Sequence, residues 1–227
     1  MSTARDLFII AMGSGHEPSV GQGDLSLALA GAELIDLLGD GHVTVDADRV
    51  VPGAGSVLDD RLLGEASDGI VRTTPYEGVE DWLWRRGKNL SATYQSALEA
   101  EGELTRKRGG RLTLGARRVE PVDTAARHSA VDRWERREPV LVALASAVGI
   151  GDGDGDGDGD GDGDGTLIGD GDDTSTTDEP SDIEPVLDDE AATAVVAAVH
   201  DAIMELEAVR QRRTIENSAF ANLWRGP

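Results

Sequence analysis

Cysteine is absent from the 227-residue chain, and lysine and aromatic residues are scarce. Without cysteine the protein can form no disulfide, no thiolate metal site and no cysteine nucleophile. The two lysines are Lys88 and Lys107, so arginine supplies nearly all of the positive charge. Low lysine with high aspartate is favoured by a salt-rich cytoplasm, although a genome rich in G and C also depletes lysine.

Acidic residues outnumber basic residues by 44 to 21, which gives a net charge of −23. Such a chain is repelled by nucleic acid and by anionic membranes unless its basic groups are gathered in one place. Residues 151–227 have a net charge of −17 and residues 1–150 have a net charge of −6. Residues 105–137 reverse the sign, with 10 basic against 4 acidic residues, and an anionic partner is expected to approach there.

Long apolar runs are also missing. The run at residues 7–12 is too short, and too soon followed by glycine, to span a membrane, and it lacks the pattern of a signal peptide. We therefore expect a cytoplasmic protein.

The periodicity of apolar residues predicts a mainly α-helical fold, a single helical bundle with one or two short β-hairpins. Residues 24–38 have helical spacing and end at Gly39, and residues 42–51 contain two β-rich runs that Pro52 stops. Leu90, Tyr94 and Leu98 share one face of a helix that Gly102 ends. An amphipathic segment is expected at 56–63, and helices at 139–150 and 189–210.

Glycine and aspartate alternate strictly over residues 151–164. Such a tract has no apolar surface to bury, which predicts a disordered acidic insertion at 151–188 between a helical domain at 1–150 and a segment at 189–227, whose helix returns to the core before a tail. Asp152 opens a pattern like an EF-hand loop, but its twelfth position is Gly163 and not glutamate, so no calcium site is predicted.

No other motif predicts catalysis, a metal or a cofactor. The glycine-rich loop at 13–23 matches neither a dinucleotide fingerprint nor a Walker A loop, no G-x-S-x-G is present, and the four histidines lack ligand spacing. The pairs Asp59-Asp60 and Asp188-Asp189 precede expected helix starts, where capping explains them. The chain is expected to be non-enzymatic.

The basic stretch permits three interpretations. Its arginines could balance acidic groups elsewhere in the fold. Alternatively, a hairpin with Arg106, Lys107, Arg108 and Arg111 beside an apolar tip suits an anionic membrane surface, where each basic group adds about 1 kcal/mol. A helix followed by a basic hairpin is also the outline of a winged helix, in which the same residues contact nucleic-acid phosphates.

Several segments, in order, resemble the Golgi phosphoprotein 3 family, particularly its prokaryotic members. The resemblance covers about residues 5–150, with 189–210 as a weaker closing helix, and rests on order and spacing. The matching segments are residues 6–11, 29–37, 41–45, 57–59, Trp82, 90–94, 98–104 and 141–149.

The resemblance implies a helical, non-catalytic peripheral membrane adaptor. Eukaryotic relatives bind phosphatidylinositol 4-phosphate in a pocket of one Trp and three Arg, and the aligned positions here are Gly21, Ala30, Lys88 and Ser91, of which Lys88 alone is charged. A lysine cannot reproduce the fork of an arginine on a phosphate.

The resulting site hypothesis is an anionic headgroup bound without a cofactor or metal. Its residues are Lys88, Arg106, Lys107, Arg108 and Arg111. A protein-interaction module and the winged helix remain the alternatives, although the net charge argues against nucleic acid.

Overall fold

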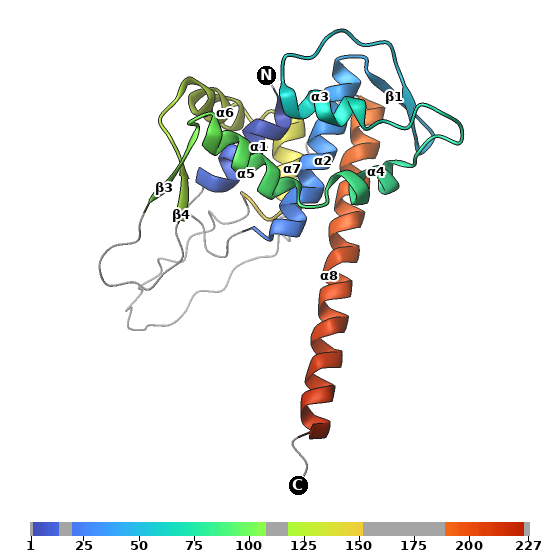
Figure 1. The fold of residues 1–227 in the computed structure, drawn as a ribbon, viewed down its shortest axis with the longest axis vertical. Coiled ribbons are helices and arrows are strands. Elements are labelled where there is room, and N and C mark those ends of the chain that lie inside the picture. The colour runs from blue at the N-terminus through green and yellow to red at the C-terminus, as the bar shows by residue number, and fades with distance from the viewer. Residues whose placement is uncertain (1, 14–19, 108–117, 152–188, 225–227) are drawn as a thin grey trace, which may run out of the picture.

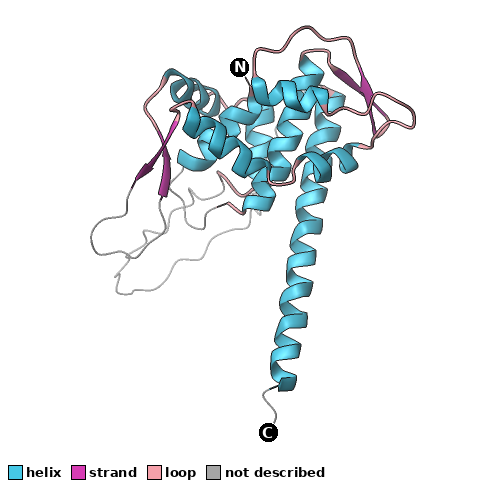
Figure 2. Ribbon diagram, viewed as in Figure 1, coloured by secondary structure: helices cyan, strands magenta, loops and turns pink. Residues whose placement is uncertain are grey.

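The computed structural model describes residues 2–13, 20–107, 118–151 and 189–224. In these residues the chain forms eight helices and two antiparallel hairpins (Figure 1, Figure 2). The helices are α1 (Thr3–Gly13), α2 (Gln22–Gly39), α3 (Arg61–Asp68), α4 (Val79–Arg86), α5 (Leu90–Ala100), α6 (Ala125–Glu135), α7 (Pro139–Ala147) and α8 (Glu190–Trp224). The strands are β1 (Val43–Asp46), β2 (Arg49–Pro52), β3 (Leu104–Lys107) and β4 (Arg118–Pro121).

These elements confirm the predicted mainly helical fold with two hairpins. In the first hairpin Val43 pairs with Pro52 and Asp46 with Arg49, as the two β-rich runs indicate. Apart from Gly151, the insertion predicted at 151–188 lies outside the described residues.

Helix α2 is the centre of the bundle, and α1, α3, α4, α5, α7 and α8 all pack against it. Most of its faces are therefore buried, with Leu29 and Leu34 at 0% exposure. Small residues allow the neighbouring backbones to come close. A Cβ atom at Gly31 would lie 2.3 Å from Cγ2 of Val199, so glycine is required where α8 passes α2.

Aromatic side chains fill the space around α2. The rings of Phe8 on α1 and Tyr94 on α5 stack with centroids 6.1 Å apart. Trp82 on α4 is fully buried, and its indole N–H donates to the carbonyl oxygen of Ala30 at 3.2 Å. The hydrogen bond satisfies the one polar group that this tryptophan brings into the core.

A buried ion pair joins three of these helices. Glu33 on α2 is 0% exposed, and Arg86 on α4 donates to it through Nε at 2.6 Å and Nη2 at 2.8 Å. The hydroxyl of Tyr94 donates to the same carboxylate at 3.0 Å. Burial raises the pKa of Glu33, and the hydrogen bonds from Arg86 and Tyr94 oppose that rise. The paired guanidinium makes burial of this carboxylate tolerable.

Two further carboxylates fix α1. Asp36 on α2 accepts the backbone N–H groups of Thr3 at 3.1 Å and Ala4 at 3.4 Å, and so caps the start of α1 from another helix. Asp6 on α1 pairs with Arg133 on α6. Both contacts attach α1 to parts of the chain distant in sequence.

Of the predicted capping residues that are described, Asp60 and Asp189 cap a helix and Asp59 does not. Asp60 accepts from the backbone N–H groups of Leu62 and Leu63 at 2.8 and 3.1 Å, so α3 begins at Arg61, five residues after the start of the expected segment 56–63. Asp189 accepts from the N–H of Ala191 at 2.9 Å at the start of α8, whereas Asp188 lies outside the described residues.

Helix α8 is longer than its sequence pattern indicates. Helical periodicity was expected to end near Arg210, but the helix continues to Trp224. Figure 1 shows the first half of α8 against the bundle and the second half projecting beyond it. The spacing of apolar residues predicts only the half of α8 that packs on the bundle, because the projecting half needs no apolar stripe toward the core.

Candidate functional site

A groove of about 370 Å³ opens where the start of α2, the turn between α4 and α5, and the middle of α8 meet. Its lining residues are Gln22, Gly23, Ser26, Leu27, Trp84, Gly87, Lys88, Asn89, Ser91, Ala92 and Leu206. We call this the Lys88 groove, because Lys88 is the one lysine or arginine that lines it.

Two helices begin at the Lys88 groove without a side-chain cap. Gly21 precedes α2 and has no side chain to accept a hydrogen bond, and Asn89 precedes α5 in a left-handed conformation (φ 60°) without a capping bond. The positive ends of the two helix dipoles favour an anion, although at α5 the N–H groups of Leu90 and Ser91 already donate to Gly87 and Ser26.

The floor of the Lys88 groove is held rigidly. Ser91 on α5 donates two hydrogen bonds to α2. Its backbone N–H donates to Oγ of Ser26 at 3.0 Å, and its hydroxyl donates to the carbonyl oxygen of Gln22 at 3.2 Å. A Cβ atom at Gly87 would lie 2.6 Å from the carbonyl oxygen of Leu83, so the turn before Lys88 requires glycine. Lys88 is thus presented by a fixed turn, with its side chain exposed.

One carboxylate, that of Asp24, lies near the Lys88 groove, and its charge is balanced by an arginine. Asp24 lies in the first turn of α2, and Nη1 of Arg210 on α8 is 2.8 Å from both of its oxygens. Arg210 lies close to Gly23, because a Cβ atom there would be 2.8 Å from Nη2 of Arg210. The sequence did not indicate Arg210, since no local pattern reveals a pair separated by 186 residues.

The positions aligned with the family's phosphoinositide pocket have different surroundings. Lys88 and Ser91 line the groove, and Gly21 directly precedes it. Ala30 is 0% exposed in the core and contributes nothing to the groove. The structure therefore brings three of the four positions together.

The hairpin of β3 and β4 lies at the other end of α5. Lys88 precedes α5 and Arg106 follows it, and eleven helical residues span about 16 Å. Nη2 of Arg106 is 2.7 Å from a carboxylate oxygen of Glu99, which raises the pKa of Arg106. Lys107 is described only by its backbone, and Arg108 and Arg111 lie outside the described residues.

Some other cations of the basic stretch are also paired. Arg133 contacts Asp6 and has Nη2 3.2 Å from Glu138, and Arg136 is 3.6 Å from Asp132. Arg133 serves the packing of α6 on α1. The balancing role considered for the basic stretch therefore applies to Arg106, Arg133 and Arg136.

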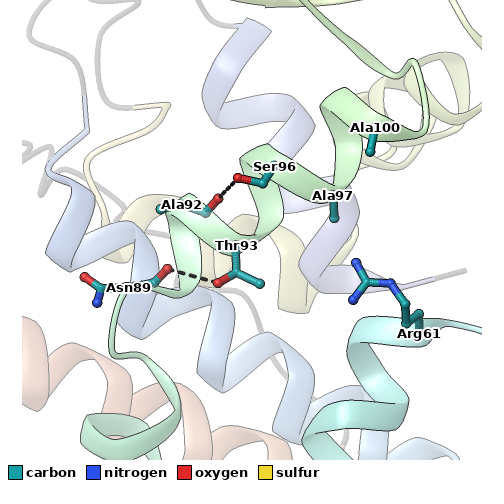
Figure 3. Close-up of a pocket in the computed structure, with 7 residues that line it drawn as sticks. All are labelled: Arg61, Asn89, Ala92, Thr93, Ser96, Ala97 and Ala100. Atoms are coloured by element: carbon teal, nitrogen blue, oxygen red, sulfur yellow. Dashed lines mark hydrogen bonds between the residues drawn. The ribbon is translucent and has the colours of Figure 1, made fainter.

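A second groove, of about 450 Å³, lies between α3 and α5 (Figure 3). Its lining residues are Arg61, Asn89, Ala92, Thr93, Ser96, Ala97 and Ala100. The hydroxyls of Thr93 and Ser96 donate to carbonyl oxygens four residues earlier, at 3.3 and 2.9 Å, and Arg61 is 2.5 Å from Glu65. Although larger, this groove offers an anion one cation that is already paired, so we regard the Lys88 groove as the better candidate.

One serine and histidine pair resembles a catalytic arrangement. Ser67 Oγ is 3.1 Å from Nδ1 of His42, whose Nε2 is 2.5 Å from the carbonyl oxygen of Ser56. The carbonyl accepts the Nε2 proton, which leaves Nδ1 to accept from the serine hydroxyl. Neither residue lines either groove, and the bonds attach the first hairpin to the following loop and to α3.

Metal ligands and membrane spans were also sought in the described part of the chain. There, no group of three or more His, Asp or Glu side chains could hold a metal ion. No helix among the same residues combines the length and apolar character needed to cross a bilayer.

Comparison with known proteins decides the family. The family model described as Golgi phosphoprotein 3 (GPP34) matches residues 4–157, more than half of the chain. The chain belongs to the Golgi phosphoprotein 3 family. This confirms the resemblance seen in the sequence, and the matched region contains α1 to α7 and both hairpins. A search of curated proteins finds no match.

Proposed function

We propose that this member of the Golgi phosphoprotein 3 family is a non-catalytic adaptor that binds anionic lipid headgroups at the membrane surface from the cytoplasm. The observation that supports this most is the Lys88 groove, where an exposed lysine stands beside two uncapped helix starts. Each of these features favours a phosphate, and together they form a concave site of headgroup size.

The chemistry of the groove implies loose selectivity. Family resemblance suggests a headgroup of the phosphatidylinositol 4-phosphate type, which relatives bind with arginines. Here Lys88 offers a compact charge without the planar fork that reads phosphate geometry. We therefore expect the protein to discriminate lipids by headgroup charge more than by the position of the phosphate on the ring.

The second hairpin is the proposed second contact. Arg106 and Lys107 lie in β3, and Arg108 and Arg111 follow them in the sequence. Each unpaired basic group near an anionic surface adds about 1 kcal/mol, and Arg106 would first have to leave Glu99. In Figure 1 the strands β3 and β4 descend on the same side of the bundle as the start of α2, which is part of the Lys88 groove. Helix α8 projects farther on this side (Figure 1), so a membrane surface would have to meet both elements beside that helix.

Co-sedimentation of the full chain with liposomes tests the proposal. Vesicles of phosphatidylcholine alone are compared with vesicles that also contain phosphatidylinositol 4-phosphate or, at matched charge, phosphatidylserine. Lys88→Ala should weaken binding to both acidic mixtures several-fold, whereas Lys88→Arg should retain it. Arg61→Ala removes one positive charge in the second groove and is the matched control.

Two results would reject the proposal. One is equal binding to neutral and acidic vesicles. The other is equal loss from Lys88→Ala and Arg61→Ala, which would show a general charge effect with no role for the Lys88 groove. Binding that fails with every vesicle would favour the alternative of a protein-interaction module.

A further inference from the structure

Beyond the pair of Arg210 with Asp24, the second half of α8 is a helix without a partner in the described part of the chain. Its first half is buried, with Val195 and Val199 at 0% exposure and Ala202 at 2%. The second half projects from the bundle (Figure 1, Figure 2), residues 211–217 are all exposed, and Ile215 is 69% exposed. A projecting helix of about 18 residues is only marginally stable in water unless another surface covers it.

The face of α8 that is buried in the bundle continues into the projecting half. The packed positions are separated by four, three and four residues: Val195, Val199 and Ala202 are buried, and Leu206 is partly buried. The same steps continue through Val209, Arg213 and Glu216 and, in the sequence, Phe220 and Leu223. This 4-3 spacing is the pattern of a coiled-coil seam, and over so short a length a straight helix keeps such positions on one face.

The polar residues within this seam are opposite in charge and three positions apart. Both Arg213 and Glu216 are exposed, and neither has an ion-pair partner among the described residues. Two copies of this helix can pair in antiparallel orientation with the two-fold axis between Arg213 and Glu216. Arg213 of each copy then faces Glu216 of the other. Position 209, which is Val209, then lies opposite position 220 of the second copy.

Other arrangements fit this seam less well. A parallel pair places Arg213 against Arg213 and Glu216 against Glu216, which is repulsive. A membrane surface would bring both charged groups toward the apolar layer in the middle of the face. The charge pattern thus complements itself in one orientation only.

From these observations we propose that the projecting half of α8 binds a second copy of this chain as an antiparallel helix pair with two Arg213–Glu216 ion pairs. The interface is isologous, as a two-fold dimer requires. It goes beyond the proposed lipid binding and does not depend on it, because none of its charged residues lines the Lys88 groove.

Sedimentation equilibrium of the full chain, over a wide range of protein concentrations, tests the dimer by a charge exchange. Wild-type protein should dimerise with increasing concentration. Arg213→Glu alone and Glu216→Arg alone should each weaken association at least roughly tenfold, because each places like charges in contact twice. The double variant Arg213→Glu/Glu216→Arg should restore association to nearly the wild-type level.

Arg212→Glu is the matched control, because it makes the same charge change at the adjacent position, about 100° around the helix and off the seam. It should leave association nearly unchanged. Val209→Asp supplies a second disruption that does not involve the ion pair. Circular dichroism of each variant verifies that the helices are retained.

Several outcomes would overturn the proposal. They are a wild-type chain that stays monomeric at every concentration, a dimer that Arg213→Glu leaves intact, equal weakening by Arg212→Glu, and a double variant that fails to recover. Vesicle binding by α8 in a monomeric chain would assign this face to a membrane instead. Lys88→Ala should not change the mass, so failure of the dimer and failure of lipid binding are separable.

Discussion

Arg210 on α8 places its Nη1 atom 2.8 Å from both carboxylate oxygens of Asp24, which lies 186 residues earlier in the first turn of α2. The pair attaches α8 to the start of α2, beside the Lys88 groove. It also occupies a guanidinium that could otherwise face an anion there. The contact therefore influences both the stability of the fold and the charge of the proposed site.

Asp24→Asn should strengthen binding to acidic vesicles. The substitution removes a negative charge beside the Lys88 groove and releases Arg210, while the loss of a half-exposed ion pair should lower the free energy of unfolding by less than about 1 kcal/mol. Asp68→Asn makes the same change at an exposed position at the end of α3 and is the control. Unchanged or weaker vesicle binding by Asp24→Asn would contradict the proposed role of the groove.

Breaking the buried ion pair of α2 should strongly destabilise the protein. Arg86→Met leaves the carboxylate of Glu33 buried without a compensating charge, which typically costs about 3–5 kcal/mol. Tyr94→Phe removes only one donor and should cost about 1–3 kcal/mol. Urea unfolding measures both, and Arg106→Met, in the exposed pair with Glu99, should change stability little. A small effect of Arg86→Met would show that the pair is not needed for the fold.

The same glutamate predicts a dependence on pH. Burial raises the pKa of Glu33 above its ordinary value of 4.5, so the folded state binds this proton at a higher pH than the unfolded state does. Stability from this group therefore increases as the pH falls through the raised pKa toward 4.5, and decreases as the pH rises. The burial of Asp6 and Asp36 raises their pKa values and acts in the same direction.

The free energy of unfolding of wild-type protein minus that of Glu33→Gln should accordingly be larger at mildly acidic pH than at neutral pH. Wild-type protein gains from protonation of this site, whereas the variant cannot, and effects from other groups cancel in the difference. Urea unfolding of both proteins at the two pH values measures it. A difference that shrinks on acidification would contradict the assigned direction of the pKa shift.

The approach of α8 to α2 should make Gly31 intolerant of a side chain. Gly31→Ala places its Cβ against Val199, and such overpacking costs about 1–3 kcal/mol despite the better helix propensity of alanine. The cost should fall in the double variant with Val199→Ala. Gly64→Ala on α3 is the control, because no atom lies within 4 Å of its added Cβ, and it should be neutral or stabilising. Equal thermal stability of the two glycine variants would contradict this packing.

Local patterns in the sequence predicted the parts of the fold that depend on local interactions. The periodicity at 24–38, the hairpin around Ala47 and the caps at Asp60 and Gly102 all appear in the structure, since each follows from backbone preference or a single buried face. Helix α6 was not predicted: Ala130 is its one buried residue, so it has almost no apolar stripe.

The candidate site was less predictable. Lys88 and Ser91 were identified by resemblance, but the Lys88 groove results from two helix starts far apart in sequence. The pairing of Arg210 with Asp24 and of Arg133 with Asp6 depends on tertiary packing, which residue spacing does not encode. The hairpin residues Arg108 and Arg111 remain predictions from charge alone.

The placement of two tryptophans gives the protein an internal optical reporter. Trp84 lines the Lys88 groove, whereas Trp82, two residues earlier, is sealed in the core beside α2. A headgroup that enters the groove would alter the surroundings of one indole and leave the other as a constant reference. Trp134 and Trp224 also emit, so emission spectra recorded during a vesicle titration of wild-type protein and of Trp84→Phe would together distinguish occupancy of the groove from attachment elsewhere, with no added label.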